Sequence, residues 1–185
     1  MKFNNRPNRC IEVAGKTCWI SRDVTVLAIV FFVVGETAYV PLGLRGRQMP
    51  TEPGKWGLPG GYLDYDETVG EAIIRETWEE LGLNIPHLQA QYSFQGSLDQ
   101  PYYVASQPLR LQNVSLRFPM MFFLENTAQL PPLQPQVAVE EVAETQWYAL
   151  EKAIEMQLAF NHQTIMQHCL ESYYKDIWLP PIFST

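Results

Sequence analysis

Three glutamates, Glu76, Glu79 and Glu80, are spaced so that they would share one face of a helix. At about 100° per residue they fall within an arc of about 100° on a helical wheel. Carboxylates one helical turn apart repel one another by a few tenths of a kcal/mol even when exposed. A divalent cation would convert this repulsion into a coordination site, and a ligand set made only of oxygen points to Mg²⁺ or Mn²⁺. The alternative for this spacing alone is a solvated acidic helix face.

The segment that carries these glutamates has the signals of a helix over about 69–81. Thr68 and Glu71 have the spacing of a capping box, and Gly82 stands where a left-handed C-terminal cap belongs. The residues expected to face the core group on the other side of the wheel; they are Ile73, Ile74, Thr77 and Leu81. Core packing could therefore hold the helix while its acidic face points into a cleft.

Residues 61–83 read GYLDYDETVGEAIIRETWEELGL, and this segment resembles the signature of the Nudix hydrolases. The matching positions are Gly61, Glu67, Arg75, Glu76, Glu79, Glu80, Gly82 and Leu83. Thr77 stands at a position that the signature gives to an apolar residue, which is a mild departure because its methyl group can still face the core. The Leu-Pro-Gly-Gly that ends at Gly61 and the later Trp147 also fit this family.

The resemblance implies roles for the matching carboxylates. By position, Glu79 and Glu80 are metal ligands, and Glu76 ligates an additional ion or orients water. Arg75 and Glu67 are expected to form a structural pair that ties the loop to the helix. An exposed ion pair worth under about 1 kcal/mol is the alternative for that pair.

The two glycines before the helix would let the backbone approach a ligand closely. The carbonyl of Gly60 could ligate the metal, and amides near Gly60 and Gly61 could face phosphate oxygens. An ordinary tight turn is the alternative. We therefore expect both glycines to belong to the metal and substrate site.

Candidates outside the signature are two pairs of residues on predicted loops. Glu140 or Glu141 could add a metal ligand or general base, as residues in this region do in many family members, but a solvated loop pair is an equal alternative. Tyr102 and Tyr103 could bind the substrate by stacking on a nucleobase. The alternative for these tyrosines is ordinary packing.

The resemblance implies metal-dependent hydrolysis of the pyrophosphate bond in a nucleoside diphosphate linked to another group. Mg²⁺ is the expected cofactor and Mn²⁺ the alternative. ADP-ribose or a related nucleotide sugar is the first expectation for this small-molecule substrate. Pro101 follows the signature slightly later than the proline that such members often have, and Tyr102 or Tyr103 would match the tyrosine of members that act on dinucleoside polyphosphates, so neither clue decides. Two alternatives stay open: a sanitising pyrophosphohydrolase of oxidised nucleoside triphosphates, and a non-catalytic domain that senses a nucleotide.

The family resemblance implies an α/β fold, an α/β/α sandwich with a mixed β-sheet. The order of elements read from the residues agrees with it: strands over 24–34 and 37–44, a loop over 45–65, strands over 89–94, 114–124 and 145–150, a loop over 96–108, and a helix over about 151–171. The 185 residues, 46% of them hydrophobic, predict one domain with a sizeable core. We expect a short N-terminal extension at about 1–22 and a C-terminal tail at about 175–185.

Composition excludes several other classes. A formal charge of -7 disfavours a nucleic-acid binder with a broad basic face. The longest apolar run, 24–34, is too short to cross a membrane, and the first residues lack the apolar core of a secretory signal, so a cytoplasmic protein is expected.

The cysteines form no CxxC pair, and His162 and His168 would lie on different helix faces as surface or partly buried residues, so no zinc site is expected. Dimerisation is common in the family, which leaves a homodimer open.

Overall fold

The computed structural model describes residues 9–106 and 113–178, and a mixed β-sheet forms the centre of this part of the chain. Its main strands run in the spatial order β10 (Val142–Ala149), β4 (Thr37–Arg45), β3 (Val24–Val34), β9 (Val114–Leu124) and β7 (Ser93–Gly96). Three short strands extend the sheet: β5 (Trp56–Gly57) beside β4, β6 (Gly60–Tyr62) beside β3, and β8 (Tyr103–Ala105) beside β9.

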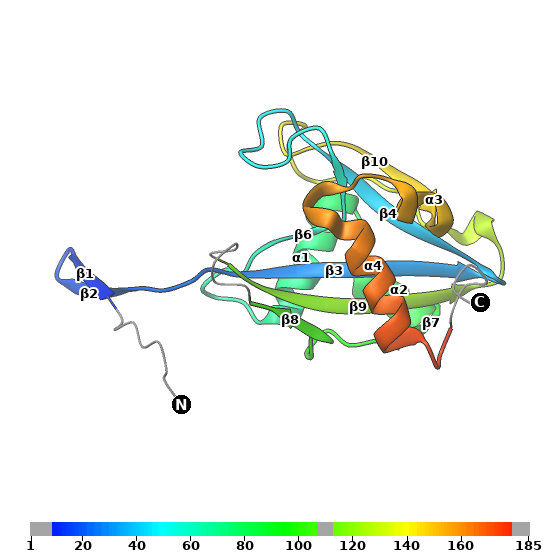
Figure 1. The fold of residues 1–185 in the computed structure, drawn as a ribbon, viewed down its shortest axis with the longest axis horizontal. Helices are drawn as coiled ribbons and strands as arrows, with labels where there is room; N and C mark the ends of the chain where they lie inside the picture. The colour runs from blue at the N-terminus through cyan, green and yellow to red at the C-terminus, as the bar shows by residue number, and fades with distance from the viewer. Residues whose placement is uncertain (1–8, 107–112, 179–185) are drawn as a thin grey trace.

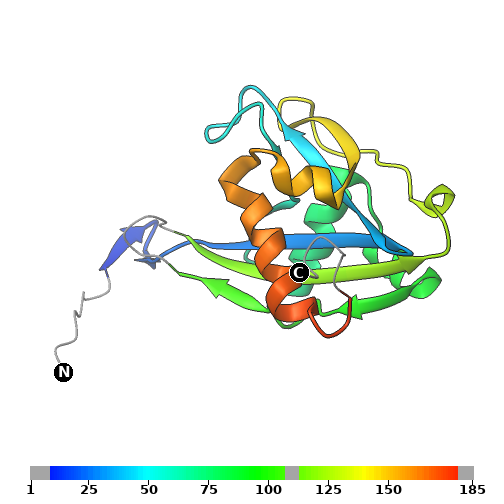
Figure 2. The same cartoon turned by 45° about the vertical axis from the view of Figure 1, so that its right-hand side comes forward.

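Helices cover both faces of this sheet (Figure 1; Figure 2). On one face lie α1 (Val69–Leu81) and α2 (Ile85–Gln91), and on the other lie α3 (Leu150–Glu155) and α4 (His162–Cys169). The predicted α/β/α sandwich with a mixed sheet is therefore confirmed. No helix among residues 9–106 and 113–178 is both long and apolar enough to cross a bilayer.

Strand β3 is the centre of the core because it is buried on both faces. It pairs in parallel with β9 along its whole length and antiparallel with β4. Leu27, Ile29 and Phe31 point to the face covered by α3 and α4, whereas Ala28 and Val30 point to the face covered by α1. A central strand covered on both sides is expected to be continuously apolar, which is the pattern that 24–34 shows. The predicted hairpin of 24–34 and 37–44 is confirmed.

Helix α1 begins and ends at the predicted residues. The Thr68 hydroxyl accepts a hydrogen bond from the Glu71 amide, and the Glu71 carboxylate accepts one from the Thr68 amide. Gly82 ends the helix in the left-handed conformation, with φ 73°. A Cβ at Gly82 would lie 2.2 Å from the carbonyl oxygen of Gln134, so the close approach of that chain segment also requires glycine.

Several predicted boundaries were wrong. The loop at 45–65 contains β5 and β6, and the loop at 96–108 contains β8, with 107–108 outside the described residues. The strand predicted at 89–94 is instead the end of α2 followed by β7. The Asn84 side chain caps α2 at the His87 amide, and a proline occupies its first turn, so local capping outweighed the strand pattern. The strand predicted at 145–150 begins earlier, at Val142, and ends at Ala149.

The helix predicted at about 151–171 is broken into two. After α3 the chain forms a 3-10 turn, Ala159–Asn161, before α4 begins at His162, and a π turn follows at Leu170–Tyr174. Phe160 and Asn161 have φ values of 53° and 57°, and two left-handed residues in succession cannot continue a right-handed helix.

The N-terminal extension contains a hairpin that the sequence analysis did not predict. Strands β1 (Arg9–Val13) and β2 (Lys16–Ile20) form a separate two-stranded sheet, which projects from the body of the molecule (Figure 1). Of the predicted tail at about 175–185, residues 179–185 lie outside the described residues.

Candidate functional site

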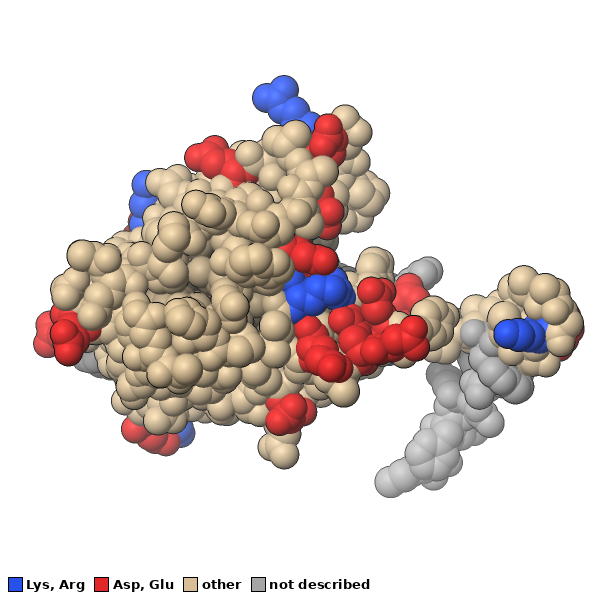
Figure 3. Space-filling view, turned by 180° about the vertical axis from the view of Figure 1, so that it is seen from behind, with Lys and Arg blue, Asp and Glu red and all other residues tan. Residues whose placement is uncertain are grey.

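Arg75 lies at the centre of the acidic face of α1. Its guanidinium forms two hydrogen bonds with Glu67, of 2.9 and 2.7 Å, and donates to the Tyr62 carbonyl oxygen at 3.0 Å. The same group donates to Glu76 at 2.8 Å and to Glu79 at 3.0 Å. These bonds tie the loop before α1 to the helix, and the bond from Arg75 lowers the pKa of the Glu67 carboxyl. The view from the α1 side shows acidic side chains gathered around a basic group (Figure 3).

Glu76 is enclosed by the β6 backbone. Only 7% of this residue is exposed, and a Cβ added to Gly61 would lie 2.4 Å from its Oε1 atom. Burial raises the pKa of the Glu76 carboxyl, and the nearby charges of Glu79 and Glu141 act in the same direction, against the opposing effect of Arg75. Gly61 is therefore the residue that makes room for this carboxylate.

Glu80 is linked to the other glycine of β6. Its Oε2 atom accepts a hydrogen bond of 3.1 Å from the Gly60 amide. Burial, followed by the charges of Glu76 and Glu141, raises the pKa of the Glu80 carboxyl to about 8. A Cβ at Gly60 would lie 2.3 Å from the Val26 carbonyl oxygen, so the strand pairing itself leaves no room for a side chain there.

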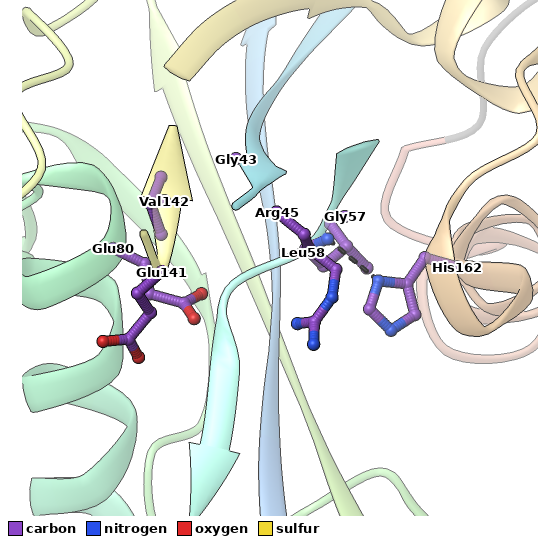
Figure 4. Close-up of a pocket in the computed structure, with 8 residues that line it drawn as sticks. All are labelled: Gly43, Arg45, Gly57, Leu58, Glu80, Glu141, Val142 and His162. Carbon is purple, nitrogen blue, oxygen red and sulfur yellow. Dashed lines mark hydrogen bonds between the residues drawn. The ribbon is translucent and has the colours of Figure 1, made fainter. Parts of the chain in front are cut away.

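Of the two glutamates predicted before β10, the structure places only Glu141 at the pocket. Glu141 lines a pocket together with Glu80 and Arg45, and its charge acts on both Glu76 and Glu80 (Figure 4). Glu141 immediately precedes Val142, the residue of β10 that pairs with Arg45 of β4. The Gly46 amide donates to the Glu141 carbonyl oxygen at 2.8 Å. Both glutamates are exposed, but Glu140 does not line this pocket.

The carboxylates that surround β6 fit a hard divalent cation by their chemistry. They offer only oxygen, and burial together with neighbouring carboxylates raises the pKa of both the Glu76 and the Glu80 carboxyl. Among residues 9–106 and 113–178, no three acidic, histidine or cysteine side chains converge on one ion position as they stand. Two of these carboxylates, those of Glu76 and Glu79, are instead bonded to the Arg75 guanidinium.

The two predicted substrate-binding tyrosines lie on the α4 side of the sheet. The Tyr102 hydroxyl lies 3.2 Å from Nδ1 of His168, and the Tyr102 ring packs against the core below α4. Tyr103 is 41% exposed, with the Arg117 guanidinium 4.8 Å from its ring centre. In the described part of the chain, no hydrogen bond or ring contact joins either tyrosine to the carboxylates of α1.

Sequence reasoning missed Arg45 and assigned His162 the wrong environment. Arg45 lines the pocket, donates twice to the Thr51 carbonyl oxygen and places its guanidinium 5.0 Å from the Phe160 ring centre. His162, expected as a surface or partly buried residue, is only 6% exposed and faces the same pocket. Neither residue belongs to a motif, and only the pairing of distant segments brings them to this place.

The pH dependence of stability should report the raised pKa of Glu80. Since this pKa is about 8 in the folded chain against an ordinary value of 4.5, the folded state holds its proton more tightly than the unfolded state does. The contribution of the Glu80 proton to the free energy of unfolding is complete below about pH 4.5 and is lost as the pH rises toward about 8. In the presence of a chelator, the melting temperature of the native chain should therefore fall between about pH 5 and about pH 8. We expect this fall to be at least about 3 °C larger than the fall measured for Glu80→Gln.

The substituted glutamine would keep an oxygen for the Gly60 amide, so the comparison isolates the charge. Parallel melting curves for the two proteins over this pH range would mean that Glu80 is an ordinary exposed carboxylate.

Comparison with known families gives a match over most of the chain. A family model described as the NUDIX domain matches residues 24–169. Among curated proteins, Nudix hydrolase 19, chloroplastic, of Arabidopsis thaliana is 28% identical over 109 residues, which are 59% of this chain and 22% of that protein. The segments matched in three curated relatives span only 16%, 22% and 21% of those proteins.

Solved structures share the fold. The NUDIX domain of NrtR from Shewanella oneidensis, in complex with ADP ribose, aligns with a TM-score of 0.61 at 21% identity and covers 82% of this chain and 88% of that one. A bifunctional NMN adenylyltransferase/ADP ribose pyrophosphatase from Francisella tularensis, in complex with AMP and a Mn ion, aligns with a TM-score of 0.55 at 25% identity over 81% of this chain and 41% of that one.

Proposed function

The chain belongs to the Nudix family, and on that premise we propose that it is a divalent-metal-dependent hydrolase of the pyrophosphate bond in nucleoside diphosphate derivatives. The observation that carries this proposal is the grouping of Glu76, Glu80 and Glu141 around β6, with raised pKa values for the first two carboxyls. Such a grouping destabilises the folded chain unless a cation or a proton compensates it. Perturbed carboxyls in a pocket are typical of a functional site.

Mg²⁺ or Mn²⁺ would be held by Glu76, Glu79 and Glu80, with the Gly60 carbonyl as a further ligand. When bound, such an ion polarises phosphoryl oxygens and lowers the pKa of a coordinated water. Arg75 would then keep its two bonds to Glu67 and release its bonds to the helix carboxylates, because a divalent charge competes for the same oxygens.

Two further residues of the pocket would bind the substrate and accept a proton. Arg45 carries the positive charge in the pocket and would bind a phosphate oxygen of the substrate. Glu141 would accept the proton of the attacking water, whose oxygen forms the new bond to phosphorus as the anhydride bond breaks. The second phosphate leaves with the electron pair of that bond. No covalent intermediate with the protein is needed.

ADP-ribose is the first candidate substrate. The Shewanella oneidensis domain with the same fold is in complex with ADP ribose, and the Francisella tularensis protein is described as an ADP ribose pyrophosphatase. We keep Tyr103 as the proposed contact for a nucleobase, because 41% of this residue is exposed and its ring already has a ring neighbour in Tyr102, at 6.1 Å between ring centres.

We expect the purified chain to convert ADP-ribose into AMP and ribose phosphate in the presence of Mg²⁺ or Mn²⁺. Chromatography of the products, run beside other nucleotide sugars, dinucleoside polyphosphates, NADH and oxidised nucleoside triphosphates, measures the preference. Cleavage of triphosphates to monophosphate and pyrophosphate, with ADP-ribose left intact, would contradict ADP-ribose as the substrate. It would favour a sanitising pyrophosphohydrolase of nucleoside triphosphates. Tight nucleotide binding without turnover of any compound would favour a sensing domain.

A further inference from the structure

His162 reaches across the molecule to the segment that leads into β6. Its Nδ1 atom accepts a hydrogen bond of 2.9 Å from the Leu58 amide, and both residues are buried (Figure 4). A Cβ at Gly57 would lie 3.3 Å from that same Nδ1 atom, so the β5 backbone packs directly on the ring. A residue from the α4 side of the sheet thus contacts the backbone that carries Gly60.

Three successive residues of this segment are fixed by three different parts of the fold. His162 holds the Leu58 amide, the β3 amide of Ala28 donates to the Pro59 carbonyl oxygen at 3.0 Å, and Glu80 accepts from the Gly60 amide at 3.1 Å. The first bond is the only one of the three made by a side chain outside the α1 face and the sheet. The place of Gly60 relative to Glu80 therefore depends on a histidine more than a hundred positions along the chain.

We propose that His162 is a positioning residue of the metal site, which holds the Leu58–Gly60 backbone where Gly60 and the α1 carboxylates can share one cation. This inference rests on the proposed function and adds to it a residue that touches neither metal nor substrate. Outer partners of this kind commonly change metal affinity by about tenfold to a hundredfold when removed.

The chain holds His162 in this place at a cost. Phe160 and Asn161 immediately before it both adopt the left-handed conformation, which is unfavourable for a bulky aromatic residue and persists only where the surroundings impose it. The Phe160 ring lies 5.6 Å from the His162 ring, and the Arg45 guanidinium lies 5.0 Å from the Phe160 ring centre. The turn therefore aims the histidine inward and also places a pocket residue.

The protonation state of His162 suits a permanent acceptor. Burial, together with the charges of Arg45 and Arg117, lowers the pKa of His162 to about 3. The ring is therefore neutral at ordinary pH, and because Nδ1 accepts the Leu58 hydrogen bond, the proton must reside on Nε2. A charged imidazolium would have no lone pair for the Leu58 amide.

The test compares three substitutions of His162 with a control in the same helix. His162→Phe keeps the ring volume without an acceptor, His162→Ala removes both, and His162→Asn restores an oxygen near the place of Nδ1. Met166→Ala, at a fully buried position of α4, lowers stability without touching the hydrogen bond to Leu58. Mn²⁺ affinity is measured on the whole chain by electron paramagnetic resonance titration, and exchange of the Leu58 amide hydrogen is followed by NMR.

We expect the phenylalanine and alanine variants to bind Mn²⁺ at least about tenfold more weakly and to exchange the Leu58 amide faster by a similar factor. We expect the asparagine variant to recover most of both losses, and Met166→Ala to keep the native Mn²⁺ affinity. Native affinity in His162→Phe, or an equal loss in Met166→Ala, would overturn the positioning role. Failure of the native chain to bind Mn²⁺ at all would instead overturn the proposed function.

Discussion

Glu79→Gln and Glu80→Gln are each expected to lower turnover by at least about a hundredfold. Each change removes a negative charge from the proposed ligand set of a metal that contributes several kcal/mol to the transition state. Glu79 is the more exposed of the two, with 38% of its side chain accessible and one hydrogen bond to Arg75. Glu80 accepts a hydrogen bond from the Gly60 amide, which glutamine can still satisfy. Steady-state kinetics with saturating Mg²⁺ measure the effect.

Folding should survive both changes, because neither removes a buried apolar group. Glu36→Gln, in the exposed turn between β3 and β4 at the other end of the sheet, is the matched control and should keep full turnover. Turnover close to the native value in both helix variants would mean that the acidic face of α1 is only a solvated surface.

Gly61→Val should lower kcat/KM by about a hundredfold while the chain still folds. A Cβ at this position would lie 2.4 Å from Oε1 and 2.8 Å from the carboxyl carbon of Glu76. The obstructed group is the end of a flexible side chain, so the carboxylate can move aside at little cost in stability. A displacement of about 1 Å at a catalytic group can itself cost about a hundredfold in rate.

Gly60→Ala gives the contrasting result expected from the same strand. Its Cβ would meet the Val26 carbonyl oxygen at 2.3 Å, and backbone cannot move aside as a side chain can. We therefore expect Gly60→Ala to lower the melting temperature and Gly61→Val to lower activity. Native kinetics in a well-folded Gly61→Val variant would be incompatible with the place assigned to Glu76.

The sequence predicted the elements whose caps and apolar pattern lie within one short segment. Helix α1 has its capping box, its left-handed glycine and one apolar face within the same short segment, so its bounds could be predicted from the sequence. Strand β3 is apolar from Val26 to Val34, the stretch in which both of its faces are covered. The bidentate pairing of Arg75 with Glu67 likewise joins positions in one motif.

The sequence could not predict features that arise from contacts between distant segments. His162 meets Leu58 because the turn Ala159–Asn161 packs against β5. The strained Phe160–Asn161 pair that breaks the C-terminal helix has no marker such as glycine or proline. The choice between Glu140 and Glu141 depends on how the chain enters β10, where Val142 pairs with Arg45 of β4 beside the pocket. Such pairings follow from the assembled sheet rather than from the residues alone.

The most direct test of the proposed function is hydrolysis of ADP-ribose in isotopically labelled water, followed by mass spectrometry of both products. We predict AMP and ribose phosphate, with the label on one of them, in reactions that require added Mg²⁺ or Mn²⁺ and are lost in Glu80→Gln. The label identifies the phosphorus that the water attacks, because it enters only the phosphate that receives the nucleophile. Equal product formation in chelator and in metal, or equal rates in the native chain and Glu80→Gln, would contradict a metal-dependent hydrolase centred on the α1 carboxylates.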